Sequence, residues 1–137
     1  MREILFKAKR KDNGEWVEGY YRADPDLNMH FICGWNYYLS ENGLEREPFE
    51  YEIDPDTLCQ YIGKTDKKNR KIFENDIVKD GKWLGKIVCR DSNFEMDLFK
   101  YSKVTGKYFA VFTRSCFEVE EVIGNIFDNP ELLEVGV

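Results

Sequence analysis

Four cysteines and one histidine are the residues of this 137-residue chain best suited to act as nucleophiles or metal ligands. Cys33, Cys59, Cys89 and Cys116 are spread almost evenly, and no two form the C-x-x-C pair that zinc ribbons and thioredoxin-like sites need. We expect all four to be reduced, apolar core residues. His30 lies in a strand-like run and is expected to be half-buried and structural. The sequence therefore predicts no metal site and no cofactor.

Two other stretches resemble catalytic motifs but lack residues that the chemistry requires. Residues 63–65, Gly-Lys-Thr, end like a phosphate-binding loop, but Leu58 stands where the first glycine of that loop is needed. Glu120 and Glu121 are adjacent, so on a strand they would point to opposite faces and could not act on one substrate. We therefore expect that the protein is not an enzyme.

Basic residues are concentrated in one segment of an acidic chain. The net charge is −6, yet residues 57–117 carry thirteen Lys or Arg against seven Asp or Glu. A basic face can contact phosphates and a tryptophan can stack on a base, so this segment is a candidate nucleic-acid surface. The candidate contact residues are Lys64, Lys67, Lys68, Arg70, Lys71, Lys82, Trp83 and Lys86. The alternative is a solvated turn whose lysines pair with the acidic segments 41–56 and 118–137.

Aromatic residues suggest a different kind of surface. They make up 15% of the chain and include Trp16, Trp35 and Trp83. Tryptophan and tyrosine are enriched in the residues that dominate protein–protein contacts. A protein partner, or a second copy of the chain in a homo-oligomer, is therefore the other candidate partner.

Short strands separated by tight turns must position these residues. Alternating apolar and polar residues, bounded by turn residues, indicate strands of this kind. The predicted strands are residues 4–8, 15–21, 28–33, 45–53, 57–62, 77–79, 85–90, 94–101, 108–113 and 118–126. Asn13-Gly14 predicts a hairpin between the first two, because a type I′ turn needs positive φ at its central residues. Later turns are predicted at Asp80-Gly81, Ser92-Asn93 and Thr105-Gly106.

The strands predict a mainly β fold with two subdomains. Asp54-Pro55-Asp56 interrupts the chain, so residues 1–56 form a hairpin-rich subdomain, β or α+β. The short strands within residues 57–137 suit a small closed barrel, which leaves no long edges unpaired. Asn129-Pro130-Glu131 predicts the start of a short C-terminal helix.

Three stretches together resemble one family. They are MREILFKA at residues 1–8, QYIGKTDKKNRKIFENDIV at residues 60–78 and VIGNIFDNPELL at residues 122–133. In this order they resemble the YopX family, small proteins of bacteriophages and of prophages of Gram-positive bacteria, with the weakest match over residues 9–56. The resemblance implies an N-terminal subdomain followed by an SH3-like barrel, and it implies no activity. Asn75 stands where a glycine is common, and asparagine tolerates the left-handed conformation of such a turn.

These inferences predict a phage or prophage accessory protein, a non-catalytic module for protein interaction or self-association. The alternative is a nucleic-acid-binding barrel that uses the basic segment 64–86. The longest apolar run, residues 108–112, is far shorter than the roughly 20 residues of a membrane span, and the N-terminus is too charged for a signal peptide. We therefore expect no membrane association and a cytoplasmic location in the bacterial host cell.

Overall fold

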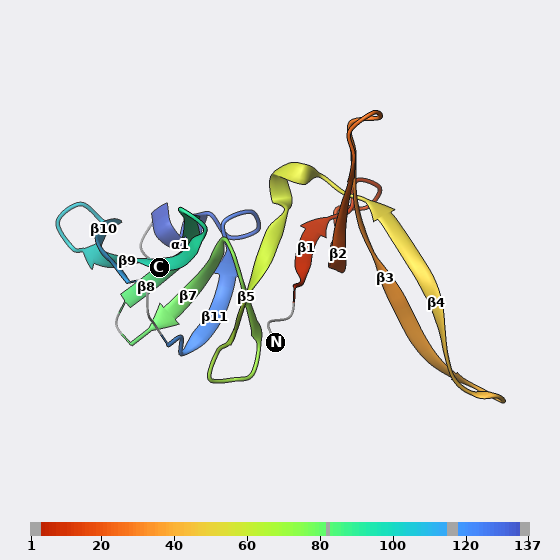
Figure 1. The fold of residues 1–137 in the computed structure, drawn as a ribbon. Helices are drawn as coiled ribbons and strands as arrows, with labels where there is room; N and C mark the ends of the chain where they lie inside the picture. The colour runs from red at the N-terminus through yellow and green to blue at the C-terminus, as the bar shows by residue number, and fades with distance from the viewer. Residues whose placement is uncertain (1–3, 82, 115–117, 135–137) are drawn as a thin grey trace. The chain divides into compact units, whose positions relative to one another are not determined.

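The protein is described by a computed structural model over residues 4–81, 83–114 and 118–134 (Figure 1). Within these residues the fold is mainly β, as predicted, and its strands pair antiparallel. The chain divides into two compact units, Met1–Gln60 and Tyr61–Val137. The break at Asp54-Pro55-Asp56 lies inside the first unit. There it forms a 3-10 turn, η1 (Pro55–Thr57), in which the Asp54 carboxylate accepts a bond from the Asp56 N–H at 3.0 Å.

The first unit is a meander of four strands joined by the beginning of a fifth. Its strands are β1 (Phe6–Lys9), β2 (Trp16–Asp24), β3 (Met29–Ser40), β4 (Gly43–Glu52) and the first residues of β5 (Cys59–Thr65). Their spatial order is β4-β3-β2-β1, and β5 joins β1 through the pairs Phe6–Gln60 and Lys7–Cys59. The β1–β2 hairpin is confirmed, but its turn is not of type I′, because Gly14 has a positive φ (72°) and Asn13 does not.

Strands β3 and β4 are longer than the sequence analysis predicts. The prediction ends one strand at residue 33 and begins the next at residue 45. In the structure β3 continues to Ser40 and β4 begins at Gly43, across a turn at Glu41-Asn42. The predicted strand ended too early because alternation after Cys33 is short and breaks where Tyr37, Tyr38 and Leu39 follow one another. The Asn42-Gly43 step, of the same kind as Asn13-Gly14, was the signal that marked this second hairpin.

A small core holds the first unit together. Ala8, Ile32 and Ile53 are fully buried. The side chains packed around them are Phe6, Val17, Tyr21, Phe49 and Leu58. His30 is half-buried, as predicted, and its Nδ1 lies 2.6 Å from the Tyr21 hydroxyl.

The second unit contains one five-stranded sheet. The remaining elements are β6 (Lys71–Phe73), β7 (Asp76–Asp80), β8 (Trp83–Arg90), β9 (Asn93–Ser102), β10 (Lys107–Arg114), β11 (Glu121–Asn125) and α1 (Glu131–Glu134). The sheet order is β10-β9-β8-β7-β11, and the later part of β5 pairs with β6. Among the described residues no pairing joins β10 to β11, so a closed SH3-like barrel stays a prediction.

Turn geometry in the second unit confirms one prediction and corrects another. Asn75 has a φ of 70°, as expected of a residue in a glycine position. Gly124 lies where β11 shifts register against β7, and a Cβ there would be 2.5 Å from Asn129 Oδ1. The turn between β8 and β9 lies at Asp91-Ser92, with φ values of 50° and 66°, and not at Ser92-Asn93. Strand β9 therefore begins at Asn93, one residue earlier than predicted.

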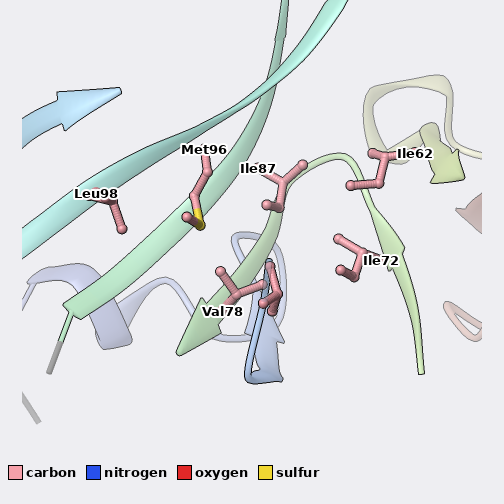
Figure 2. Packing of buried hydrophobic residues seen from close by; sticks show 7 residues of the cluster. Ile62, Ile72, Val78, Ile87, Met96 and Leu98 are labelled. Carbon is pink, nitrogen blue, oxygen red and sulfur yellow. The ribbon is translucent and has the colours of Figure 1, made fainter. Parts of the chain in front are cut away.

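Aliphatic side chains from several strands form the core of the second unit (Figure 2). The buried members are Ile62, Ile72, Val78, Ile87, Met96, Leu98 and Val119. Gly85 belongs to the same face of β8 as Ile87, and a Cβ on it would lie 2.7 Å from the Met96 sulfur. The residue at this position must be small because Met96 already fills the space.

The cysteines only partly follow the prediction of four core residues. Cys59 is buried and Cys33 is half-buried, but Cys89 is exposed near the end of β8, which corrects its assignment to the core. Cys116 lies outside the described residues. No helix in the described part of the chain is long and apolar enough to cross a membrane.

Candidate functional site

The outer part of the β3–β4 hairpin forms an arm, which we define as residues 34–48. Strand β2 accompanies β3 only up to the pair Tyr20–Cys33, whereas β3 and β4 continue to pair as far as Ser40–Gly43 (Figure 1). At the tip, the Ser40 hydroxyl accepts a bond from the Asn42 N–H at 3.1 Å. The arm is therefore a two-stranded ribbon, a structure that is marginally stable by itself in water.

One face of the arm is apolar and exposed. Trp35, Tyr37 and Leu39 lie directly opposite Pro48, Arg46 and Leu44, so all six side chains share a face. We call these six residues the apolar face. The Leu39 and Leu44 side chains are 83% and 69% exposed. Large apolar groups left in water in this way are typical of surfaces that contact another molecule.

The charges of the arm lie mainly on its other face. Glu45 and Glu47 pair with Tyr38 and Asn36, whose positions alternate with those of the apolar face. Arg46 is the cation on the apolar face, and its guanidinium lies 4.0 Å from the centre of the Trp35 ring. The apolar face thus carries one charge, held over an aromatic ring.

The base of the arm is fixed to the first unit by both faces of β3. On the core side, a Cβ on Gly34 would lie 2.9 Å from the Phe49 ring, so that ring packs directly on the backbone. On the other side, Arg22 makes two hydrogen bonds to the Glu50 carboxylate, at 2.9 and 3.0 Å. A hollow of about 470 Å³ lies at the base of the arm. Its lining includes Tyr20, Cys33, Trp35 and Pro48.

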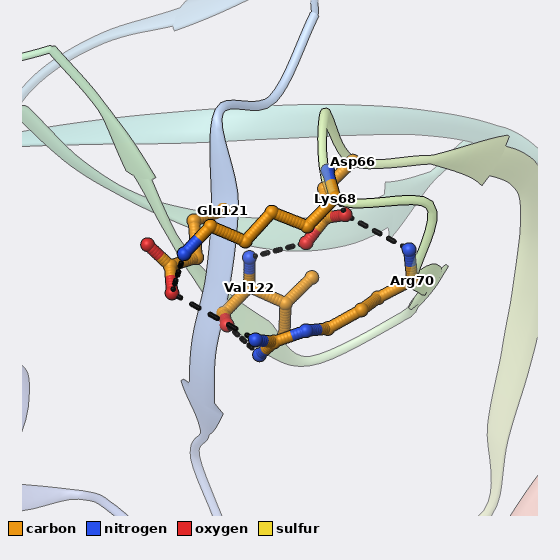
Figure 3. A network of polar contacts seen from close by, with 5 residues as sticks. All are labelled: Asp66, Lys68, Arg70, Glu121 and Val122. Carbon is orange, nitrogen blue, oxygen red and sulfur yellow. Dashed lines mark hydrogen bonds and ion pairs between the residues drawn. The ribbon is translucent and has the colours of Figure 1, made fainter.

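The predicted basic cluster is a tight loop built around one buried carboxylate (Figure 3). Asp66 is 5% exposed, and its Oδ1 accepts bonds from the N–H groups of Lys68 and Arg70, both at 2.9 Å. Its Oδ2 accepts the N–H of Val122 in β11, also at 2.9 Å. Burial raises the pKa of Asp66, but these three N–H groups and the Arg70 charge outweigh it, and the net pKa is lowered.

Two of the basic side chains turn toward an acidic residue of the same unit. Lys68 Nζ lies 3.0 Å from Glu121 Oε1, and Arg70 lies 3.9 Å from the same oxygen. Arg70 also donates to the Val122 carbonyl at 3.3 Å (Figure 3). This is the arrangement expected of a solvated turn that pairs with the acidic C-terminal segment.

The other candidate nucleic-acid contacts do not gather on one face. Lys64, Lys67 and Lys71 lie in or beside the same loop and are exposed. Trp83 packs against the core, whereas Lys86 is three residues along β8 and therefore on the opposite face of the strand. Lys82 lies outside the described residues.

The arm was missed at the level of the sequence, although its residue types were noted. Trp35 appeared there only as part of the aromatic content, together with Trp16 and Trp83. In the structure the three tryptophans differ: Trp16 lies 4.7 Å from Lys7 Nζ, Trp83 contacts the core, and Trp35 is exposed on the arm.

Comparison with known proteins identifies a family and structural relatives. The YopX protein family matches residues 5–134. The crystal structure of protein EF1440 from Enterococcus faecalis is similar, with a TM-score of 0.51 and 25% sequence identity, over 98% of this chain and 100% of that one. None of the curated proteins matches the chain at a significant level.

Proposed function

This chain belongs to the YopX protein family, and we propose that it is a non-catalytic module for protein interaction or self-association. In this proposal it is an accessory protein of a phage or prophage that acts in the cytoplasm of the bacterial host. The observation that carries the proposal is the exposed apolar face of the arm.

The arm supports an interaction role because, among the residues that the structure describes, no third strand pairs with it. Its strands pair with each other beyond Cys33, and Trp35, Tyr37, Leu39 and Leu44 are all at least 43% exposed. A ribbon gains little stability from pairing alone, and apolar side chains in water add none. A protein surface that covered this face would remove apolar area from water and order the ribbon at the same time.

The basic loop supports the nucleic-acid alternative less well. Lys68 and Arg70 face Glu121, and Asp66 fixes the loop backbone. A phosphate would have to compete with the Glu121 carboxylate for these two cations. The chain as a whole is also acidic, which weakens its attraction for nucleic acid. The alternative therefore stays a prediction.

We also propose that the second unit is an SH3-like barrel. Support comes from the backbone that follows β5 and the backbone that precedes β11. Lys67 donates its N–H to the Val119 carbonyl at 3.1 Å, and Val122 donates to Asp66. These bonds bring the first and last strands of the unit together around the core that contains Ile62 and Val119, which is the kind of contact that closes a small barrel.

The test of the interaction proposal removes the apolar side chains and leaves the ribbon in place. A variant with Trp35→Ser, Leu39→Ser and Leu44→Ser is compared with wild type by sedimentation velocity of the purified protein and by in-cell cross-linking with mapped sites. The matched control is Tyr101→Ser with Val104→Ser, which removes exposed apolar side chains from the second unit. We expect wild type and control to form the same complex and the arm variant to lose it, with an unchanged circular dichroism spectrum. An arm variant that assembles like wild type would refute the proposal.

A further inference from the structure

We propose that the partner of the arm is a second copy of the chain, joined by antiparallel pairing of the free edge of β3 with the same edge of its mate. This inference rests on the proposed function, which requires only that the arm contacts some protein. It adds the identity of the partner, the strand edge that is used and the register of the pairing.

The hydrogen-bonding direction of β3 follows from its pairing with β4. Ile53 donates its N–H to the His30 carbonyl at 2.9 Å, so the bonded pairs between the two strands fall on even-numbered residues of β3. The N–H and C=O groups of odd-numbered residues then point away from β4. Near the base these groups face β2, where Cys33 pairs with Tyr20. Beyond that point Trp35, Tyr37 and Leu39 turn theirs to an edge that pairs with no other strand in the described part of the chain, which we call the open edge.

The two edges of the arm differ in their protection against pairing. The β4 edge carries Glu45, Arg46, Glu47 and Pro48, and charges and proline are the residues that block strand addition. Pro48 lies opposite Trp35, a position at which an N–H would point outward. The β3 edge, residues 34–40, has the sequence GWNYYLS and carries no charge. A strand can therefore add to β3 without desolvating a charged group.

The open edge is complementary to itself. It is bounded by the β2 pairing at Cys33 and by the turn at Glu41-Asn42, which leaves seven residues centred on Tyr37. About a two-fold axis at that residue, Tyr37 faces the partner subunit's Tyr37, and Trp35 faces the partner subunit's Leu39. All of these pairs are uncharged. The odd-numbered residues would exchange about six hydrogen bonds across the axis.

The result is one four-stranded sheet in the order β4-β3-β3-β4. It places the apolar faces of both arms side by side, so that aromatic and aliphatic side chains form cross-strand pairs. Three or more strands with a hydrophobic face reach the stability that an isolated ribbon lacks. An acidic partner such as a nucleic acid gains nothing from this uncharged edge. A second copy supplies both the edge and the matching apolar residues.

The test compares two substitutions at one position and a third directly opposite. Tyr37→Pro removes the outward N–H. Tyr37→Val introduces a side chain close in size to that of proline but keeps the N–H. Arg46→Pro puts the same block on the opposite edge, because Arg46 pairs with Tyr37. The dimer dissociation constant of each protein is measured by sedimentation equilibrium. We expect wild type to dimerise, Tyr37→Pro to raise the constant about a hundredfold, and Tyr37→Val and Arg46→Pro to raise it less than about tenfold.

A cross-link tests the register. A Tyr37→Cys protein should form a disulfide between its two copies under mild oxidation, because facing residues of a bonded pair lie about 5.5 Å apart. Arg46→Cys, with the same native cysteines, should not. Wild type that stays monomeric at its highest soluble concentration would overturn the inference, as would equal dimerisation of wild type and Tyr37→Pro. If a different protein is then found cross-linked to the arm, the proposed function stands and only the second copy is refuted.

Discussion

Arg46 stacks its guanidinium on the Trp35 ring, 4.0 Å from the ring centre, across the two strands of the arm. The two residues are diagonal neighbours, because Trp35 lies opposite Pro48 and Arg46 lies opposite Tyr37. The stack covers one face of the indole and links β3 to β4 by side chains as well as by backbone. An exposed cation–π contact contributes about 0.5–1 kcal/mol, which is a large share of the stability of a lone ribbon.

Removing this stack should loosen the arm without unfolding the protein. In Arg46→Ala we expect the Asn36 and Tyr38 amides, which bond toward β4, to exchange with solvent about two to five times faster. Hydrogen exchange followed by NMR measures these rates in dilute protein. Glu47→Ala, on the other face, is the control and should change them little. Unchanged rates in Arg46→Ala would show that the stack does not stabilise the ribbon.

The Tyr21–His30 contact should stabilise the first unit, where it links β2 to β3. The Tyr21 hydroxyl lies 2.6 Å from His30 Nδ1, and the two rings are stacked with centres 5.9 Å apart. Tyr21→Phe keeps the ring and removes the bond, so we expect the free energy of unfolding to fall by about 1 kcal/mol. Denaturant unfolding checks this value against Tyr37→Phe, whose hydroxyl is on an exposed side chain and should matter little. Equal stability of the two variants would contradict the assignment.

Asp66 should make the second unit sensitive to acid. Its pKa is lowered in the folded protein, against about 3.9 in an unfolded chain. The stability that it contributes is therefore fully present above about pH 4 and is lost as the pH falls through the lower, folded pKa. Below that point the protonated carboxyl no longer attracts the three N–H groups as strongly.

Asp66→Asn tests this contribution. The amide keeps one acceptor oxygen but turns an NH₂ group toward the Lys68 and Arg70 N–H groups or toward that of Val122, so we expect a loss of about 1–3 kcal/mol at neutral pH. Unfolding by denaturant at several pH values should show the gap from wild type shrinking below about pH 4. Asp26→Asn, at an exposed position, provides the control. A gap that is constant with pH would mean that the charge of Asp66 contributes nothing.

Local signals in the sequence predicted much of the strand pattern. Asn13-Gly14 and Asn75 mark turns because few residue types readily adopt a positive φ. In the structure Gly14 and Asn75 both have one. The same signal at Asn42-Gly43 was not used, because the alternation of apolar and polar residues before it breaks at Tyr37-Tyr38. In most strands the apolar residues of an alternating pattern face the core. In the arm they face solvent, and this exposure marks the arm as a candidate site.

Contacts between distant residues were not predictable from the sequence. Asp66 reads as part of a basic turn, yet its carboxylate bonds Val122, fifty-six positions later. Glu121 lies in the acidic C-terminal segment, and only the fold shows that it faces Lys68 and Arg70. The charge pattern suggested both a binding face and an internal pairing of charges. One sequence does not show which strands pair, so it does not show which charges meet.

The nucleic-acid alternative can be tested directly with fluorescence anisotropy of labelled single- and double-stranded oligonucleotides. Because Lys68 and Arg70 already face Glu121, we expect no binding at physiological salt and little at low salt. Glu121→Gln frees both cations without changing the size of the side chain, so any weak affinity should rise in that variant. Lys67→Glu with Lys68→Glu should abolish it. Binding by wild type that weakens linearly with salt on a log–log plot, and that disappears in the double variant, would instead establish the loop as a phosphate-contacting surface.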